Sequence, residues 1–266
     1  MKRLNQKETQ ERLLNIGKEF HRICERHGIP YYMLGGTMLG AIRHKGFIPW
    51  DDDMDFGVER KYFAKLVDLI RSESSYKLSD RYNSDIIFYD FDKMEDGRVL
   101  IEDPTVEHIV KNRNLYIDIF PLDKTNGGKG FLSSNYWVHK IGVLNVFRYT
   151  NLRNMRYGKR IFLSFLRFLL KPLSRNCLID FANRFLIKGR GNYVSNLYGF
   201  WGTRETVEEQ VMGTPQLYQF EDTCFYGPQD YDSYLTSLYG DYMKLPPENE
   251  RHIHTNRVYE IENTDR

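Results

Sequence analysis

The sequence has 266 residues, of which 41% are hydrophobic and 28% are charged, so it can form one large domain, or a core with an added subdomain, and is not disordered throughout. Its formal net charge of only +2 argues against a nucleic-acid partner. The three cysteines, Cys24, Cys177 and Cys224, lie far apart without CxxC spacing, which favours a reducing cytoplasm over a disulfide-bonded secreted protein.

The N-terminal residues predict an amphipathic helix that packs on a core. Between Glu8 and His27, apolar residues recur at helical spacing, and Gly28 and Pro30 follow as signals that end a helix. The residues before this helix contain no uninterrupted apolar run, so they do not resemble a secretory signal. We expect no membrane-spanning helix, because no stretch of about 18 apolar residues occurs in the sequence.

A glycine pair follows at the junction of a predicted strand and a predicted helix. The segment from Tyr31 to Leu34 is typical of a short strand, and it leads directly into Gly35 and Gly36. We expect Thr37 to be the N-cap of a short helix that ends near His44. Glycines at such a junction let the backbone approach a phosphate closely, and the helix N-terminus offers it unpaired N–H groups.

A loop, a strand and a second helix are predicted next. The segment from Lys45 to Asp52 contains a glycine and a proline and has no hydrophobic period, as in a loop. From Asp53 to Val58, apolar residues alternate with others as in a half-buried strand, which places Asp53 and Asp55 on one face. The spacing from Lys61 to Arg71 predicts an amphipathic helix.

Three further strands are predicted before residue 126, at Tyr76–Ser79, Asp85–Phe91 and Leu115–Phe120, with Pro121 ending the last. The last of these strands carries Asp118 among apolar neighbours. Burying an unpaired carboxylate there would cost several kcal/mol, so Asp118 needs a metal ion, an arginine or a set of hydrogen-bond donors.

The character of the sequence changes after residue 126. Helices are predicted at Phe131–Tyr149, Arg160–Leu170, Leu178–Ile187 and, much later, Tyr231–Tyr239. From Lys129 to Arg190, thirteen Lys and Arg residues accompany a single acid, Asp180, which indicates an anionic partner. We expect an α/β (α+β) fold in three parts: a catalytic core with a mixed sheet (1–126), a basic helical subdomain (127–205) and a C-terminal segment that folds back on the core (206–266).

Three acidic residues predict a metal site. Asp53 and Asp55 on one strand face, with Asp118 from a neighbouring strand, make the oxygen-rich set of ligands that Mg²⁺ or Mn²⁺ prefers. Such an ion would neutralise phosphate oxygens and orient a nucleotide donor, from which most phosphoryl-transfer catalysis derives. Arg43 and Lys45 could also reach donor phosphates; the alternative is that they only complement the dipole at a helix C-terminus.

These residues lie in motifs that resemble the LicD family of phosphocholine and related phosphotransferases, whose members have the nucleotidyltransferase fold. The stretch from Tyr31 to Arg60, YYMLGGTMLGAIRHKGFIPWDDDMDFGVER, is similar to that family's signature almost throughout. The same holds for YIDIFPLD, which begins at Tyr116, and for YGDYMKLPPENERHIH, which begins at Tyr239. Together the motifs extend over most of the sequence.

The resemblance implies transfer of phosphocholine from CDP-choline to a sugar hydroxyl of a cell-surface glycan precursor, such as one of lipopolysaccharide or teichoic acid, with release of CMP. It implies a nucleotidyltransferase-fold core and a location in the cytoplasm, at the inner face of the membrane. By the same resemblance, the metal ligands are Asp53, Asp55 and Asp118, and the residues that contact donor phosphates are Gly35, Gly36 and Thr37.

Several alternatives stay open from the sequence. The donor could be another CDP-linked compound, carrying ethanolamine or an alditol phosphate, or the chain could be an inactive relative that only binds a glycan or a membrane. Asp118 is the first candidate for deprotonating the acceptor hydroxyl, ahead of His252 and His254.

Two further residue groups have a functional and a structural interpretation. Trp50, beside the acidic motif, is the aromatic candidate for holding a choline head group, and its alternative role is packing. The basic and apolar segment from Arg160 to Arg175 could lie on an anionic membrane surface, or it could be a core helix with an ordinary basic face.

Overall fold

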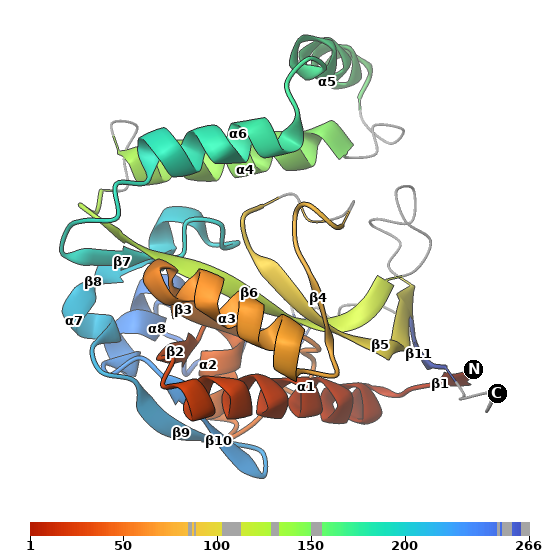
Figure 1. Cartoon of the computed structure of the whole chain (residues 1–266), viewed down its shortest axis with the longest axis vertical. Helices are drawn as coiled ribbons and strands as arrows, with labels where there is room; N and C mark the ends of the chain where they lie inside the picture. Colours follow the sequence, from red (N-terminus) through yellow and green to blue (C-terminus); the bar gives the residue numbers. More distant parts are fainter. Residues whose placement is uncertain are drawn as a thin grey trace.

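A computed structural model describes residues 1–84, 87, 89–102, 113–128, 133–149, 156–248, 251 and 257–261. Its centre is a mixed sheet of nine strands (Figure 1). The main path through the sheet runs β1 (Lys2–Arg3), β11 (Arg257–Glu260), β5 (Asp92–Glu102), β6 (Arg113–Thr125), β3 (Asp55–Glu59) and β2 (Tyr31–Met33). Only β3 and β6 on this path pair in parallel. The predicted α/β fold with a mixed sheet is therefore confirmed.

Three short strands complete the sheet. β4 (Lys77–Ser79) pairs with β5, β7 (Tyr193–Ser195) pairs with β6, and β8 (Thr206–Glu208) pairs with β7. The prediction of a strand over Asp85–Phe91 is wrong for its described residues, Ile87 and 89–91, which form no strand. The physical reason is that Asp90 bonds to arginine side chains and Tyr89 packs against a second apolar cluster, so this segment serves contacts outside the sheet.

The strand that carries Asp118 continues past Pro121, where the sequence predicted its end. On one edge of β6, the pairing with β5 ends at Ile119 and the pairing with β7 begins at Asp123. Residue 121 therefore lies in a gap between two partners, where the N–H group that proline lacks is not needed. On the other edge, Pro121 keeps its place opposite Val58 of β3.

Two predicted amphipathic helices, α1 (Gln6–His27) and α3 (Arg60–Glu73), are confirmed and pack against the sheet (Figure 1). α1 begins with a capping box, in which the side chain of Asn5 accepts from the N–H of Glu8 and the side chain of Glu8 accepts from the N–H of Asn5. It ends at Gly28, which has a φ of 61°. Its apolar stripe is fully buried, at Leu13, Ile16, Phe20 and Ile23.

The helix after the glycine pair begins earlier than predicted. α2 (Gly35–Arg43) has Leu34 as its N-cap, because Gly35, with a φ of 48°, turns the chain directly out of β2. The prediction of Thr37 as the N-cap is therefore wrong. Instead, the hydroxyl of Thr37 accepts a hydrogen bond of 2.8 Å from the N–H of Asp55, which ties α2 to β3.

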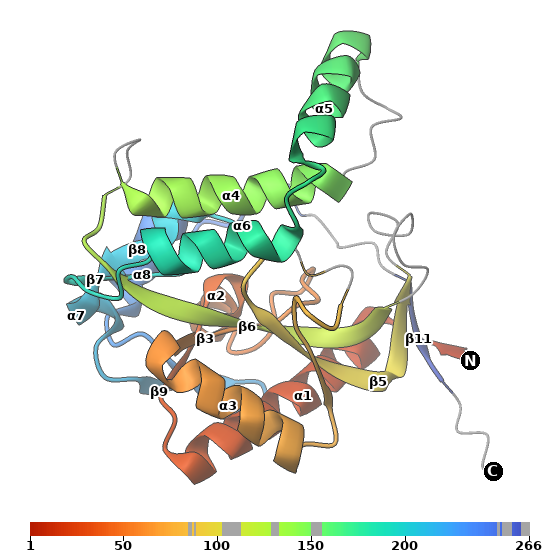
Figure 2. The same ribbon diagram turned by 45° about the horizontal axis from the view of Figure 1, so that its top comes forward.

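The predicted helices after residue 126 are present within the described residues. α4 (Ser134–Tyr149) and α6 (Arg175–Phe181), which continues as a π-helix (Ala182–Leu186), lie side by side above the sheet, and α5 (Tyr157–Leu170) projects away from the body (Figure 2). α4 and α6 share a small apolar cluster with the segment after β7, made of Val138, Ile179, Ala182, Leu197 and Tyr198. The division of the chain at residues 126 and 205 stays a prediction.

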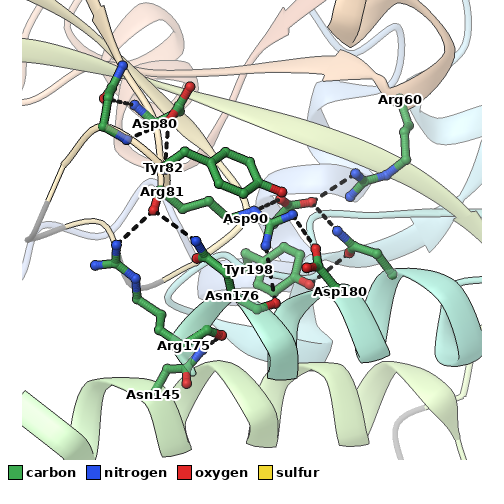
Figure 3. A network of polar contacts seen from close by, with 12 residues as sticks. Arg60, Asp80, Arg81, Tyr82, Asp90, Asn145, Arg175, Asn176, Asp180 and Tyr198 are labelled. Carbon is green, nitrogen blue, oxygen red and sulfur yellow. Dashed lines mark hydrogen bonds and ion pairs between the residues drawn. The ribbon is translucent and has the colours of Figure 1, made fainter. Parts of the chain in front are cut away.

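A network of ion pairs joins this helical layer to the sheet (Figure 3). Asp90 lies between two arginines: Arg60 Nη1 donates to it at 2.9 Å and Arg81 Nε lies 3.0 Å from it. Arg60 also donates through Nε and Nη2 to both oxygens of Asp123, which is 1% exposed on β6. Arg81 in turn bonds to Asp180 of α6 at 2.6 Å. The network therefore runs from β6 to the helical layer through Asp90.

The C-terminal part returns to the core. It contains a 3₁₀ helix (Gly202–Glu205), α7 (Glu209–Met212), the hairpin of β9 (Gln216–Phe220) and β10 (Thr223–Gly227), and α8 (Tyr231–Tyr239), which is confirmed at its predicted bounds. α8 contacts both α2 and the 3₁₀ helix. No helix in the described parts of the chain is long and apolar enough to cross a membrane.

Candidate functional site

Three charged residues form a row across three neighbouring strands. Asp55 at the start of β3 lies opposite Asp118 of β6, and Asp118 lies opposite Lys93 of β5. Residues directly opposite one another point to the same face of a sheet, so these side chains form one line. Asp53 lies two residues before Asp55, in the loop that precedes β3 rather than on the strand as predicted. The structure therefore brings Asp55 and Asp118 together and places Asp53 at the entrance of the same strand.

Burial and neighbouring carboxylates act on the pKa of Asp55. Burial raises the pKa of Asp55 well above its ordinary value, and the charges of Asp53, Asp118 and Glu205 raise it further. Burial also raises the pKa of Asp51, in the same loop as Asp53, to about 6. Burial is the largest cause of both shifts, and the nearby carboxylates add to the shift of Asp55.

Lys93 supplies positive charge at one end of the row. Its side chain is buried, its Nζ bonds to Oδ1 of Asp118, and it lies 3.6 Å from the ring centre of Tyr116. Burial lowers the pKa of this lysine, although the neighbouring charge of Asp118 acts in the opposite direction. Sequence reasoning missed Lys93 because the strand was predicted to end at Phe91, two residues earlier. A lysine next to an apolar strand residue, Met94, was the only signal.

The glycine pair at the start of α2 borders this row. A Cβ atom on Gly35 would lie 3.4 Å from Oδ2 of Asp55, and one on Gly36 would lie 2.9 Å from Oδ2 of Asp51. A side chain at residue 36 would therefore collide with a carboxylate. The N–H of Gly35 donates to the hydroxyl of Tyr234 at 3.0 Å. The N–H groups of the first helical turn have no partner within the helix, so those of residues 36 and 37 are the ones suited to an anion.

A buried carboxylate from the C-terminal part lies near enough to Asp55 to act on it electrostatically. Glu205, at the end of the 3₁₀ helix, is 6% exposed and accepts hydrogen bonds from Asn196 Nδ2 at 2.7 Å and from the backbone N–H of Trp201 at 2.9 Å. Burial raises the pKa of Glu205 to about 7. Its charge also raises the pKa of Asp55. Sequence reasoning missed Glu205, because it lies in no motif and about 150 residues separate it from β3.

Two other predicted site residues, Arg43 and Lys45, lie at or just after the C-terminal end of α2. Arg43 is at its C-terminal end, about 12 Å along the helix from Gly35, and donates to the carbonyl oxygen of Tyr242 at 2.9 Å. Lys45 is exposed, and its carbonyl oxygen accepts from the N–H of Glu221. The structure therefore does not place these two residues beside the glycine pair. His252 and His254 lie outside the described residues.

Trp50, the predicted head-group residue, packs beside the C-terminal end of α2. Its ring makes an edge contact with His44, and the guanidinium of Arg251 stacks 4.8 Å from its centre. His44 in turn accepts a hydrogen bond from Arg43. The ring is partly buried against the main core. The ring of Trp50 is therefore already in contact with one cationic side chain, that of Arg251.

The donor chemistry of the row fits a hard divalent cation. All of its candidate ligands are carboxylate oxygens, and the charges of Asp53 and Asp118 both act on Asp55. In the arrangement of the described residues, however, no three acidic, histidine or cysteine side chains are grouped closely enough to hold a metal ion. Asp118 is bonded instead to Lys93 through Oδ1. The assignment of Asp53, Asp55 and Asp118 as ligands of Mg²⁺ or Mn²⁺ stays a prediction.

A family model and a near full-length relative identify the same family. The model of the nucleotidyltransferase domain of the LicD/FKTN/FKRP family matches residues 28–157, which include the glycine pair, Asp53, Asp55 and Asp118. The lipopolysaccharide cholinephosphotransferase LicD of Haemophilus influenzae is 31% identical over 266 residues, which is 96% of this chain and 97% of that protein.

More distant relatives match parts of the chain. An uncharacterized protein of Rickettsia prowazekii, RP689, is 28% identical over 44% of this chain and 47% of its own length. The human ribitol 5-phosphate transferase FKRP is 28% identical over 105 residues, which is 40% of this chain and 19% of that protein. Near full-length similarity is therefore to a phosphocholine transferase, and partial similarity extends to a transferase of an alditol phosphate.

Proposed function

This chain belongs to the LicD family, and from that premise we propose that it transfers phosphocholine from CDP-choline to a sugar hydroxyl of a cell-surface glycan precursor, with CMP as the leaving group. The observation that carries the proposal is the pairing of Asp55 and Asp118 on parallel strands, directly beside the glycine pair at the N-terminus of α2. A carboxylate suited to a divalent cation and N–H groups suited to a phosphate therefore lie next to each other, which supports the proposal.

In the proposed reaction, the oxygen of the acceptor hydroxyl forms a bond to the phosphorus that carries choline, and the bond from that phosphorus to the oxygen of CMP breaks. The backbone N–H groups of residues 36 and 37 hold the donor phosphates. A Mg²⁺ or Mn²⁺ ion held by Asp53, Asp55 and Asp118 would neutralise charge on the phosphates and on the leaving CMP. Asp118 orients the acceptor hydroxyl and takes its proton, and Thr37 fixes Asp55 to α2 through its hydroxyl.

Release of CMP tests this function directly. We expect wild-type protein with Mg²⁺ or Mn²⁺ to release CMP from CDP-choline when a glycan acceptor is present, and we expect Asp53→Ala to abolish that release. Lipopolysaccharide and teichoic-acid precursors are the first acceptors to test. If the protein turns over CDP-ribitol or CDP-ethanolamine but not CDP-choline, the site assignment stands and CDP-choline is replaced as the proposed donor. An inactive glycan- or membrane-binding relative would release CMP from none of these donors.

We also propose that the enzyme meets a lipid-linked acceptor at an anionic membrane surface, through α5. Five large apolar side chains of this projecting helix are more than half exposed: Ile161, Phe162, Phe165, Phe168 and Leu169 (Figure 2). The same helix and its end carry four basic residues and no acid: Lys159, Arg160, Arg167 and Lys171. Exposed aromatic residues with flanking basic residues are typical of helices that lie in a membrane interface.

Vesicle co-sedimentation tests the role of α5. We expect the protein to bind vesicles that contain anionic lipid at least tenfold more strongly than neutral ones, since each basic residue near such a surface contributes about 1 kcal/mol. The double change Phe162→Ser and Phe165→Ser should abolish binding, because it removes apolar side chains that would enter the interface. Leu217→Ser is the matched control, because this residue of β9 is 55% exposed. Equal binding by the α5 variant and the control would contradict the proposal.

A further inference from the structure

Three aromatic rings from the C-terminal half meet beside the candidate site. Trp201 and Tyr239 have ring centres 5.2 Å apart at an angle of 81°, and Phe200 meets Trp201 at 5.5 Å and 89°. We call these residues, Phe200, Trp201 and Tyr239, the aromatic corner. Phe200 is 88% exposed and Trp201 is 37% exposed, so a ligand can reach both side chains. All three residues lie outside the segment that the family model matches.

The aromatic corner borders the place where donor phosphate is proposed to bind. The hydroxyl of Tyr239 lies 3.7 Å from the position that a Cβ atom on Gly35 would take, and Oδ2 of Asp55 lies 3.4 Å from the same position. Tyr239 therefore touches the N-terminus of α2 and leads from it to Trp201. In phosphocholine, an ester oxygen and two carbons separate the phosphorus from the nitrogen. A head group on a phosphate held at the start of α2 would extend over this short distance toward the corner.

Charge favours a cation in the aromatic corner. The backbone of Trp201 is bonded to the buried carboxylate of Glu205, and the guanidinium of Arg204 already lies 5.8 Å from the centre of the Trp201 ring. The ring of Trp50, the other tryptophan near α2, is partly buried against the main core and already has the guanidinium of Arg251 4.8 Å from its centre. Of these two aromatic groups, the one at Trp201 has a second, exposed ring beside it, that of Phe200.

We propose that the aromatic corner holds the trimethylammonium head group of the donor, with Trp201 and Tyr239 as its main contacts and Glu205 as the negative charge behind them. This inference rests on the proposed function, because it names the site for the head group of that donor. A quaternary ammonium has no N–H group to donate and is weakly hydrated, so ring faces and a nearby negative charge suit it. An alditol has no charge to be attracted, and a primary ammonium gives up more hydration on entering the corner.

The test measures how strongly the protein prefers CDP-choline over CDP-ethanolamine, in variants of Trp201 and of a control tryptophan. We expect wild-type protein to have a higher kcat/KM for CDP-choline than for CDP-ethanolamine, and we expect Trp201→Leu to lower that ratio by about tenfold, as loss of one partly desolvated cation–π contact would. Trp201→Phe should keep most of the ratio. Trp137→Leu on α4 is the control, because its side chain is similarly exposed, at 42%, and it should leave the ratio unchanged.

The outcomes separate the inference from the proposed function. If wild-type protein prefers CDP-choline and Trp201→Leu keeps that preference, the inference is overturned and the function stands. The same holds if Trp50→Leu, rather than Trp201→Leu, removes the preference. If wild-type protein does not use CDP-choline, the proposed function fails and the head-group site fails with it. A variant that does not fold is recognised by loss of turnover with both donors; Trp201→Gln, which also removes the ring, then provides the measurement and should lower the ratio as Trp201→Leu would.

Discussion

Replacing Asp55 by asparagine is expected to lower turnover by about three orders of magnitude or more while leaving the fold intact. The change keeps the shape of the side chain but removes a charged oxygen from the proposed metal site, where phosphoryl-transfer catalysis depends on positioning and charge. The variant should be at least as stable as the wild-type protein without metal. The reason is that burial and neighbouring carboxylates already raise the pKa of Asp55, so its charged form is unfavourable in the folded state.

The measurement combines turnover with thermal unfolding in the presence and absence of Mg²⁺. Wild-type protein should gain stability on addition of metal and nucleotide, as expected for ligands that bind only the folded state, and Asp55→Asn should not. Asp92→Asn is the matched control, because Asp92 is a half-buried carboxylate of the same sheet that lies opposite Ile119 and outside the acidic row. Near-normal turnover by Asp55→Asn would refute the assignment of the site.

The second large effect is on stability. Changing Arg60 to methionine is expected to lower the free energy of unfolding by about 3–5 kcal/mol, because it leaves the carboxylate of Asp123 buried without its bidentate partner. It also removes one of the two arginines that hold Asp90, which links β6 to the helical layer (Figure 3). The loss of stability should therefore affect the contact between the sheet and the helical layer as well as the first turn of α3.

Urea denaturation measures this loss, with Lys61→Met as the control. Lys61 is the next residue and pairs with Glu59, but its side chain is 59% exposed, so its removal should cost less than about 1 kcal/mol. Adding Asp123→Leu to Arg60→Met should recover much of the stability, because it removes the unpaired charge. A loss of less than about 1 kcal/mol in the single Arg60 variant would show that the network does not stabilise the link.

Local patterns predicted the elements whose stability is local. α1 and α3 follow from apolar residues at helical spacing, and α8 was predicted at its observed bounds. The predictions failed where a neighbouring segment decided the outcome. Thr37 resembles an N-cap in isolation, but its hydroxyl accepts from Asp55, eighteen residues later. Pro121 resembles the end of a strand, but the change of partner from β5 to β7 lets β6 continue through it.

The residues of the candidate site show the same distinction between local patterns and tertiary contacts. The motifs identified Gly35, Asp55 and Asp118, and the structure places all three together. Lys93 and Glu205 escaped prediction because neither belongs to a recognisable pattern. Their positions follow from the pairing of β5 with β6 and from the return of the C-terminal part to the sheet.

The sequence by itself determined the family, the class of fold and the acidic and glycine residues of the site, because these depend on residue types at short, fixed spacings. Only the tertiary structure decided what surrounds those residues: the lysine bonded to Asp118, the carboxylate of Glu205, and the aromatic corner beside α2. The physical reason is that desolvation and electrostatic interactions depend on distance in space. Side chains that are far apart along the chain contribute to them as strongly as neighbours once the sheet and the C-terminal helix have packed.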